Sequence, residues 1–202
     1  PFAVRSDEVV VGAKLKLIDL VAQNIETDYS PPQMLRVIHS PMLNDEFIMI
    51  FGTLQSDGKP ISNLSSWKPK ADWDGRTRPW YATGKTADSA VLSDPYIDST
   101  THETLISAVV PLRDKGQFLG VLGGDIRLKA ISDAVNTLDF NGAGYAFLLS
   151  RNGNIISHPN AELNAKNYSE LFSGKQPTLT GKLQEVQVNG KDLLVSFTPL
   201  SN

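Results

Sequence analysis

The stretch TLISAVVPLRDKGQFLGVLGGDIR, residues 104–127, decides the fold. Two runs rich in Val, Leu and Ile flank Lys115 and Gly116, an arrangement typical of two antiparallel β-strands joined by a tight turn. A shorter strand-like run, SDPYID, precedes them and is separated from them by a Ser/Thr-rich turn. The stretch EFIMIFGTLQSDGKPIS, residues 46–62, predicts a second hairpin with its turn at Asp57 and Gly58.

Helical patterns surround these strands. Apolar residues recur at helical spacing over residues 9–26, which predicts a long helix near the start of the chain. PPQMLRVIHSPML predicts a second, short helix that ends at Pro41. Helical spacing returns over residues 128–138. The combination of helices with antiparallel strands predicts an α+β fold.

The later part of the chain repeats the layout of the earlier part. GYAFLLSRNGNIISHP (residues 144–159) has the strand, turn and strand of residues 46–62, and DLLVSFTPL (residues 192–200) resembles TLISAVVPL. Asn189 and Gly190 supply a hairpin turn before that later strand. Two matches in the same order predict two related α+β modules, with a boundary near residues 140–144. Chance alignment of apolar strands is the alternative. The second module lacks a counterpart of FLGVLGGDIRL, so we expect its last strand to lie beyond residue 202.

Composition narrows the classes of function. The formal net charge is −3, which argues against a nucleic-acid partner. The chain has no cysteine, so disulfides and thiolate-bound metals are excluded. No apolar run approaches the roughly 20 residues that span a bilayer. The chain opens inside a helical pattern, and we expect it to be the inside of a longer protein whose flanks contain membrane spans.

The stretch RTRPWYATG, residues 76–84, concentrates groups suited to binding a ligand. Arginine grips a carboxylate with two hydrogen bonds, and tryptophan offers a flat apolar face. Pro79 restricts the residue before it to extended conformations. If the segment is extended, Arg78 and Trp80 point to the same side. This arrangement predicts an anion-gripping edge beside a hydrophobic wall.

A second group of residues suits a cation. In DPYID, alternation places Tyr96 and Asp98 on one face of a strand. Asp125 follows two glycines in an otherwise apolar strand, and if buried it requires a positive partner or several hydrogen-bond donors. Carboxylates beside an aromatic face are what a ligand ammonium group requires. A pocket with an anion-binding end and a cation-binding end fits an α-amino acid.

Simpler explanations exist for the same residues. Arg76 and Arg78 can form surface ion pairs with Asp74 or Asp98. Tryptophan beside proline is often a core residue, and the aspartates of DPYID can be turn residues. The three histidines, at positions 39, 102 and 158, are far apart and show no metal-ligand spacing. No nucleophile sits in a recognisable catalytic setting, so no catalytic residue, metal or cofactor is predicted, and a hydrolase or transferase is the weakest alternative.

The combination WDGRTRPWYATG…SDPYID…ISAVVPL…FLGVLGGDI resembles the double Cache domains of bacterial chemoreceptors, the extracytoplasmic sensors of methyl-accepting chemotaxis proteins. The resemblance covers nearly the whole chain. It implies an N-terminal helical region (1–44), a membrane-distal ligand-binding module (45–140) and an incomplete membrane-proximal module (141–202), each module with a PAS-like antiparallel sheet.

The resemblance also implies roles for individual residues, because the amino-acid-sensing subset of the family carries a matching motif. Arg78 and Trp80 match the positions that hold the ligand carboxylate, and Tyr81 matches a tyrosine that lines the pocket. Asp98 and Asp125 match the acids that hold the ligand ammonium group.

Two further positions complete the motif. Tyr96 matches an aromatic residue on the strand of Asp98. Trp73 departs from the pattern, because the subset usually has tyrosine there. An indole keeps the flat face but removes the hydroxyl oxygen, which leaves taurine, another amine or a carboxylate as an alternative ligand.

The protein implied by the resemblance is a non-enzymatic receptor in the inner membrane, with this domain in the periplasm. The resemblance also implies that transmembrane helices flank the domain in the full-length protein and that the receptor is a homodimer. The same type of domain also precedes histidine kinases and cyclases, so the output module stays open.

Overall fold

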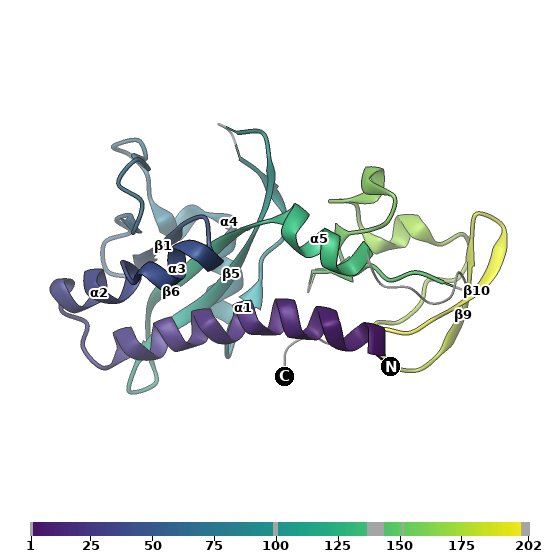
Figure 1. The fold of residues 1–202 in the computed structure, drawn as a ribbon, viewed down its shortest axis with the longest axis horizontal. Helices are drawn as coiled ribbons and strands as arrows, with labels where there is room; N and C mark the ends of the chain where they lie inside the picture. The colour runs from purple at the N-terminus through teal and green to yellow at the C-terminus, as the bar shows by residue number, and fades with distance from the viewer. Residues whose placement is uncertain (1, 99–100, 137–143, 151, 199–202) are drawn as a thin grey trace.

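The computed structural model describes residues 2–98, 101–136, 144–150 and 152–198. Helix α1 (Phe2–Glu26) runs along most of the elongated molecule. The larger sheet lies towards the carboxyl-terminal end of this helix, and the smaller hairpins lie towards its amino-terminal end (Figure 1). The prediction of a long helix is confirmed, and the helix begins earlier than the predicted start.

The larger sheet has six strands, and every pair is antiparallel. These strands are β1 (Ile50–Leu54), β2 (Ile61–Ser62), β3 (Val91–Leu92), β4 (Tyr96–Ile97), β5 (Thr104–Asp114) and β6 (Gln117–Arg127). Their order is β2-β1-β6-β5-β3, and β4 also pairs with β5. Lys115 and Gly116 have φ angles of 48° and 83°, the positive values that a tight two-residue hairpin turn needs. Both predicted hairpins of this sheet are confirmed.

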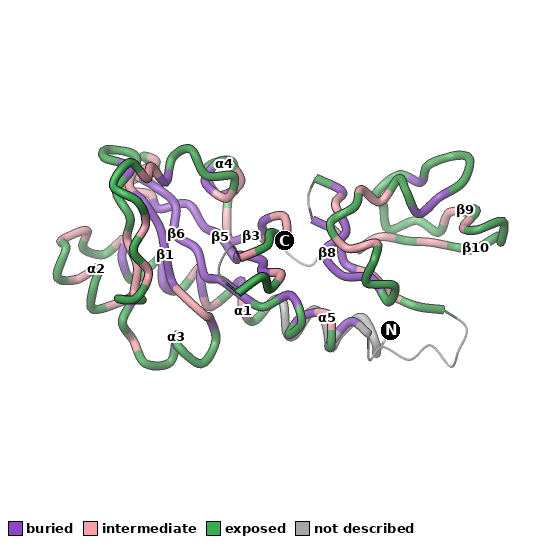
Figure 2. Tube along the Cα trace, turned by 90° about the horizontal axis from the view of Figure 1, so that it is seen from above, coloured by how far each residue is buried: buried purple, intermediate pink, exposed green. Residues whose placement is uncertain are grey.

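The two faces of the sheet are covered by different helices. Ala108 of β5 and Leu122 of β6 belong to the main hydrophobic core, which also includes buried side chains of α1. Three further helices contribute to that core: α2 (Pro31–Ile38), α3 (Pro41–Glu46) and α5 (Leu128–Asn136). On the opposite face, Val109 and Val121 pack with Tyr81 of α4 (Pro79–Thr86). Figure 2 shows the strands between these helices mostly buried.

Proline begins three of the helices. Pro31, Pro41 and Pro79 each stand at the first helical position, where the missing N–H costs no hydrogen bond and the fixed φ suits the helix. The prediction that Pro41 ends the second helix was therefore incomplete. That helix ends at Ile38, and Pro41 starts α3.

The carboxyl-terminal part contains two small hairpins and two 3₁₀ turns. These elements are β7 (Leu148–Leu149), β8 (Ile155–Ser157), η2 (Ala161–Leu163), η3 (Tyr168–Leu171), β9 (Gln184–Val188) and β10 (Lys191–Val195). The turn at Asn189 and Gly190 is confirmed, with φ angles of 51° and 76°. The strand predicted over residues 192–200 is shorter than expected. The two strands are antiparallel, and Val195, the last residue of β10, pairs with Gln184, the first residue of β9. Beyond Val195, β10 therefore has no partner residue in β9.

This part is joined to the larger sheet in two ways. Leu148 and Ile156 belong to the main core, together with residues of α1 and α5. In addition, the side-chain amide of Asn152 donates a hydrogen bond to Asp94 Oδ2 at 3.0 Å. The predicted module boundary near residues 140–144 lies mostly outside the described residues, which omit 137–143.

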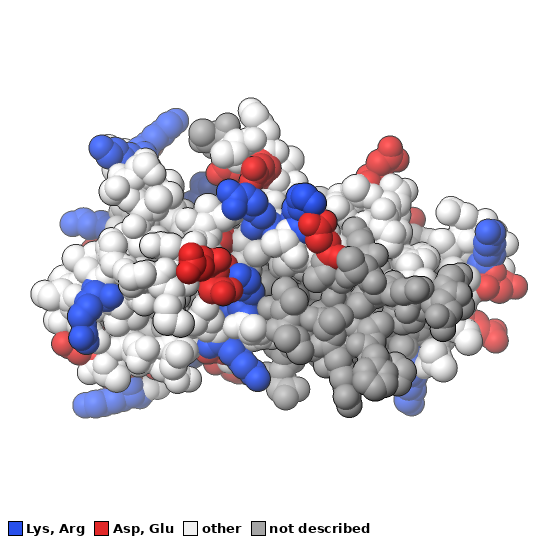
Figure 3. Space-filling view, in the orientation of Figure 1, with Lys and Arg blue, Asp and Glu red and all other residues white. Residues whose placement is uncertain are grey.

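Charged side chains of both signs are interspersed on the surface. On the face seen in Figure 3, positive and negative groups of the described residues lie close to one another. Lys14 pairs with Glu46 at 2.7 Å, and Lys129 pairs with Asp133 at 2.8 Å. Among the described residues, no helix has the length and apolar character needed to cross a bilayer.

Candidate functional site

Asp125 lies on the face of the sheet that α4 covers. Asp125 follows Gly123 by two residues and Val121 by four residues on β6, so the alternation of side chains along a strand places all three on one face. Ser107 of β5 is its cross-strand partner, and Phe51 of β1 is the partner of Gly123. Cross-strand partners share a face, so these five residues form the floor of a candidate site.

Neutral hydroxyl groups hold the buried carboxylate of Asp125. The residue is 5% exposed. Its Oδ1 accepts a hydrogen bond from the Tyr96 hydroxyl at 2.5 Å and another from Ser107 Oγ at 2.7 Å. Among the described residues, no lysine or arginine forms an ion pair with it. The sequence required a positive partner or several donors at this position, and the structure provides the donors.

The electrostatics of this carboxyl group favour a cation. Burial raises the pKa of Asp125, the two hydroxyl donors oppose that shift, and the negative charge of Asp98 adds to it. Burial and the nearby Asp125 charge also raise the pKa of Tyr96, so its phenol stays protonated and donates. A buried carboxylate with a second carboxylate nearby gains from the arrival of a positive ligand group.

Asp98 is half-buried and has two roles in the geometry. Its Oδ1 accepts hydrogen bonds from the backbone N–H of Thr101 at 2.6 Å and from Thr101 Oγ1 at 3.1 Å, as in a turn. Its charge also acts on Asp125, so the two carboxylates are electrostatic neighbours. The turn interpretation and the site interpretation of Asp98 are therefore compatible.

The predicted extended segment around Arg78 and Trp80 is wrong. Arg78 itself is extended, with φ −80° and ψ 145°, as a residue before proline should be. Helix α4 begins at Pro79, however, so Trp80 is helical, and strand alternation cannot place the two side chains on one side. Arg78 is instead the exposed N-cap residue of α4, and its guanidinium group makes no hydrogen bond or ion pair with the described residues.

The aromatic residues of α4 pack over the floor of the candidate site. The Trp80 ring meets the Phe51 ring edge-on, with centroids 4.9 Å apart. Tyr81 is 4% exposed, and its hydroxyl hydrogen-bonds to Gln55 Oε1. The core interpretation of this tryptophan is therefore right in part, since Trp80 is half-buried against the sheet and still partly accessible.

Trp73 lies beside the same face. A side chain on Gly75 would come within 3 Å of both Trp73 and Thr53, so the indole lies close to β1. Thr53 is two residues from Phe51 and shares its face. Trp73 also meets Trp67 edge-on, with centroids 5.4 Å apart. The indole at position 73 thus lies close to β1 and contacts a second indole.

Arg76 belongs to the local turn. Its guanidinium pairs with Asp74 at 2.7 Å and donates to the backbone carbonyl of Gln55 at 3.1 Å. The surface ion-pair interpretation is therefore right for Arg76. Arg78, two residues later, forms no such pair among the described residues.

Ser107, Phe51 and Gln55 are parts of the site that sequence reasoning missed. A regular two-residue hairpin around Lys115 and Gly116 places Gly124, not Asp125, opposite Ser107. The structure shifts the register between Leu112 and Arg113, and this irregularity brings Ser107 opposite Asp125. No signal in the sequence marks that shift.

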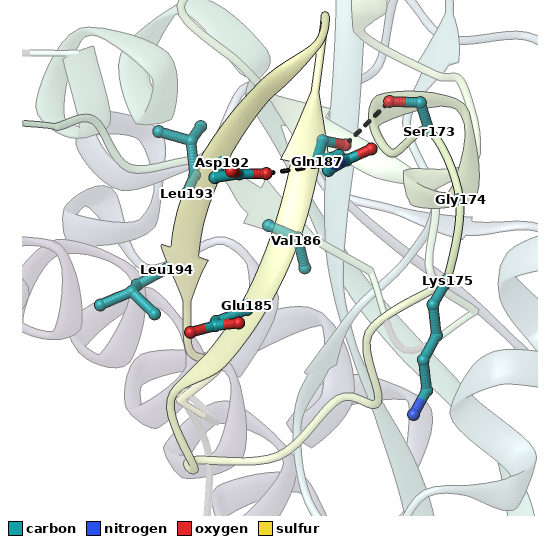
Figure 4. Close-up of a pocket in the computed structure, with 9 residues that line it drawn as sticks. All are labelled: Ser173, Gly174, Lys175, Glu185, Val186, Gln187, Asp192, Leu193 and Leu194. Atoms are coloured by element: carbon teal, nitrogen blue, oxygen red, sulfur yellow. Dashed lines mark hydrogen bonds between the residues drawn. The ribbon is translucent and has the colours of Figure 1, made fainter.

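Other features of the structure lie away from this face. Figure 4 shows a surface pocket beside β9 and β10, lined by residues 173–175, 185–187 and 192–194. None of the seven residues predicted to bind the ligand lines it. His39 and His102 are exposed, and His158 is buried. The described residues contain no group of three potential metal ligands.

Comparisons with known proteins agree with this architecture. A family model described as a Cache domain matches residues 11–202. The methyl-accepting chemotaxis protein PctB of Pseudomonas aeruginosa is 33% identical over 190 residues, which are 94% of this chain and 30% of that protein. McpG of Pseudomonas putida, also a methyl-accepting chemotaxis protein, is 36% identical over 188 residues, which are 93% of this chain and 29% of that protein. The chain therefore spans about 30% of the length of these relatives.

Two solved structures of chemoreceptor ligand-binding domains are also similar to this chain. The ligand-binding domain of PctB in complex with L-Arg matches with a TM-score of 0.78 and 30% identity, over 98% of this chain and 83% of that one. The ligand-binding domain of the chemoreceptor CtaA of Pseudomonas fluorescens, in complex with L-serine, matches with a TM-score of 0.76 and 30% identity, over 98% and 87%.

The fold and these matches define a ligand-binding sensor domain of mixed helix and antiparallel sheet. The chain belongs to the Cache domain family, and its relatives are chemotaxis receptors, a ligand-binding rather than an enzymatic group. The resemblance and the fold class predicted from the sequence are confirmed.

Proposed function

We propose that this chain is the extracytoplasmic ligand-binding region of a transmembrane chemoreceptor, and that its distal module, residues 45–140, binds an α-amino acid. The seven residues of the proposed site are Trp73, Arg78, Trp80, Tyr81, Tyr96, Asp98 and Asp125. The ligand ammonium group binds at Asp98 and Asp125, and the ligand carboxylate binds at Arg78 and Trp80.

One observation carries this proposal. Asp125 is buried with neutral donors, and Asp98 adds a second negative charge nearby. Among the described residues, no lysine or arginine pairs with Asp125, and an ammonium group would supply that positive charge through charge-assisted hydrogen bonds in a region of low dielectric. Arg78 offers a guanidinium group that the described residues leave without an ion-pair partner. The similar ligand-binding domains of PctB and CtaA are in complex with L-Arg and L-serine, which adds support.

A calorimetric panel tests the proposal. Each common L-amino acid is titrated into the domain, together with its deaminated acid and its decarboxylated amine. The proposal expects that at least one amino acid binds, and that both of its truncated analogues bind more weakly. If the acid alone binds as tightly as the amino acid, the ammonium contacts at Asp98 and Asp125 are wrong.

A second candidate ligand rests on Trp73. The resemblance implies that a tyrosine at this position contacts the ligand ammonium group, and an indole would remove that hydroxyl acceptor while it retains the flat apolar face. Taurine, another amine or a carboxylate would then be preferred. Competition between taurine and the best amino acid in the same panel distinguishes the two.

Signalling requires that the ligand bind one of two conformations better than the other. We infer that movement passes through the membrane-proximal module, residues 141–202, and along α1 to flanking transmembrane helices in a homodimer of the inner membrane. The hydrogen bond from Asn152 to Asp94, and the shared core of α1, α5 and β8, support this route. Joining the domain to a chemoreceptor, a histidine kinase or a cyclase output module in cells, and measuring the ligand response, tests which output it serves.

A further inference from the structure

A second arginine ties the turn that carries Arg78 to the larger sheet. Arg76 lies in the 3₁₀ turn η1 (Gly75–Thr77), and Arg78 follows that turn directly. The guanidinium group of Arg76 donates to both carboxylate oxygens of Asp74, from Nε to Oδ1 at 2.9 Å and from Nη2 to Oδ2 at 2.7 Å. Its Nη1 donates to the backbone carbonyl of Gln55 at 3.1 Å. One side chain therefore joins η1 to the residue that follows β1.

The carboxylate of Asp74 also holds the start of the turn. It accepts a hydrogen bond from the backbone N–H of Arg76 at 2.9 Å, and the N–H of Gly75 donates to the carbonyl of Gly58 at 3.0 Å. Gly58 has a φ of 68°, and a side chain there would collide with the Asp74 carboxylate. The turn η1 thus packs closely on the turn that joins β1 to β2.

Gln55 connects Arg76 to another residue of the proposed site. Its backbone carbonyl accepts from Arg76, and its side-chain oxygen accepts from the hydroxyl of Tyr81. Arg78 lies between these two partners in the sequence, two residues after Arg76 and three before Tyr81. The short segment that presents Arg78 is therefore anchored on both sides by the same glutamine.

The contacts of Arg76 suit positioning better than stabilisation. Its side chain is 36% exposed and that of Asp74 is 33% exposed, and exposed ion pairs contribute little to folding. The geometry is nevertheless specific, because a planar fork grips one carboxylate with two bonds and reaches a backbone carbonyl with a third. Lysine has a single nitrogen and cannot copy that fork.

We propose that Arg76 is a positioning residue, whose bonds to Asp74 and Gln55 fix the turn from which Arg78 reaches the ligand carboxylate. This inference rests on the proposed amino-acid site and deepens it. Arg76 acts through Arg78 and does not hold the ligand itself, because each nitrogen of its guanidinium group already donates to Asp74 or Gln55.

Calorimetry on the intact domain, with the best amino acid and its decarboxylated amine, tests the proposal. Arg76→Ala should weaken amino-acid binding about five- to twentyfold, because a displaced Arg78 loses part of its charged hydrogen bonding. The amine should lose less than about twofold, since it has no carboxylate for Arg78 to hold. Arg76→Lys should show an intermediate loss. Lys129→Ala removes another exposed ion pair, with Asp133, and should bind like the wild type.

Two further variants separate positioning from a general structural role. In an Arg78→Ala background, Arg76→Ala should change amino-acid affinity less than about twofold, because the side chain that it positions is already absent. Asp74→Ala should weaken binding as Arg76→Ala does. A thermal melt checks the folding of each variant, and if Arg76→Ala does not fold, Arg76→Lys and Asp74→Ala decide the question.

Four results would overturn the proposal. These are full affinity in the Arg76 variants, an equal loss for the amine, additive losses for Arg76→Ala and Arg78→Ala, and tighter binding by Asp74→Ala, which would mean that a released Arg76 holds the carboxylate itself. Arg78→Ala alone distinguishes the two levels of the argument. If it binds like the wild type, carboxylate binding at Arg78 fails together with this inference; if it binds weakly while Arg76→Ala binds normally, only this inference fails.

Discussion

Replacing Asp125 by asparagine separates the charge of this residue from its shape. Asparagine keeps an oxygen that can accept from Tyr96 and Ser107, as the carboxylate does at 2.5 and 2.7 Å. The substitution therefore preserves the local hydrogen bonds and removes one negative charge from a residue that is 5% exposed. Any effect on ligand binding then reports on that charge.

The expected loss of affinity follows from the hydrogen bond that the charge strengthens. A hydrogen bond to a charged group contributes about 1.5–3 kcal/mol, and each 1.4 kcal/mol changes Kd about tenfold. We expect Asp125→Asn to weaken amino-acid binding about 10- to 150-fold. The deaminated analogue should lose much less, because it has no ammonium group to place beside Asp125.

The same variant should raise the stability of the ligand-free protein, although it weakens ligand binding. Because the folded state raises the pKa of Asp125, the contribution of this group to stability is complete below its unfolded pKa. That contribution is lost as pH rises through the folded pKa. Asparagine copies the neutral form, so the ligand-free variant should melt at a higher temperature than wild type at pH 8, and the difference should shrink in acid.

Calorimetry and thermal unfolding of the same two proteins provide the assay. The wild type and Asp125→Asn are titrated with the best amino acid and with its deaminated acid, and each ligand-free protein is melted from pH 4 to pH 8. Equal losses for both ligands would refute an ammonium role for Asp125. A variant that melts below wild type at pH 8 would refute the view that the buried charge is costly.

Three further substitutions test the rest of the site. Arg78→Ala should weaken amino-acid binding about 10- to 100-fold and leave the decarboxylated amine unaffected in calorimetry, with the exposed Arg36→Ala as a matched control; an equal loss for the amine would contradict carboxylate binding at Arg78. Trp73→Tyr should increase the preference for amino acids over taurine in competition titrations, and an unchanged preference would remove position 73 from the specificity argument. Gly84→Ala should lower the free energy of unfolding by about 1–3 kcal/mol in denaturant titrations, because its new methyl would lie 2.4 Å from Val121 Cγ1; unchanged stability would contradict the close packing of α4 on β6.

Local patterns in the sequence predicted most of the larger sheet and its helices. The turn at Lys115 and Gly116 and the apolar runs beside it need only neighbouring residues to form, and they appear as expected. The position of Asp125 in an apolar strand also predicted that a buried carboxylate there would need a positive partner or several donors, and the structure shows two hydroxyl donors. These features depend on short-range rules, so one sequence is enough to show them.

Features that depend on tertiary packing could not be predicted in the same way. Pro79 restricts Arg78 to an extended conformation, but the proline itself can either lie in an extended segment or start a helix. Packing of Tyr81 against Val109 and Val121 favours the helix, and no neighbour in the sequence reveals it. The spatial grouping of Arg78 and Trp80 was therefore derived from the wrong element.

The pairing of Ser107 with Asp125 is a second feature that the sequence could not predict. If the strand pairs are counted outward from the hairpin turn, Ser107 is placed opposite Gly124 instead of Asp125. The register shift between Leu112 and Arg113, which causes the difference, forms only when the two strands pair. A one-residue error in register moves a side chain to the opposite face of a sheet. The contact of Ser107 Oγ with Asp125 therefore cannot be deduced from the position of the turn alone.

A crystal structure of the domain with its tightest amino-acid ligand tests the central claim most directly. The account predicts electron density for the ligand on the α4 side of the sheet, with its carboxylate beside Arg78 and its nitrogen within hydrogen-bond distance of Asp98 and Asp125. A ligand in the reverse orientation, or one bound only in the carboxyl-terminal part, would contradict it.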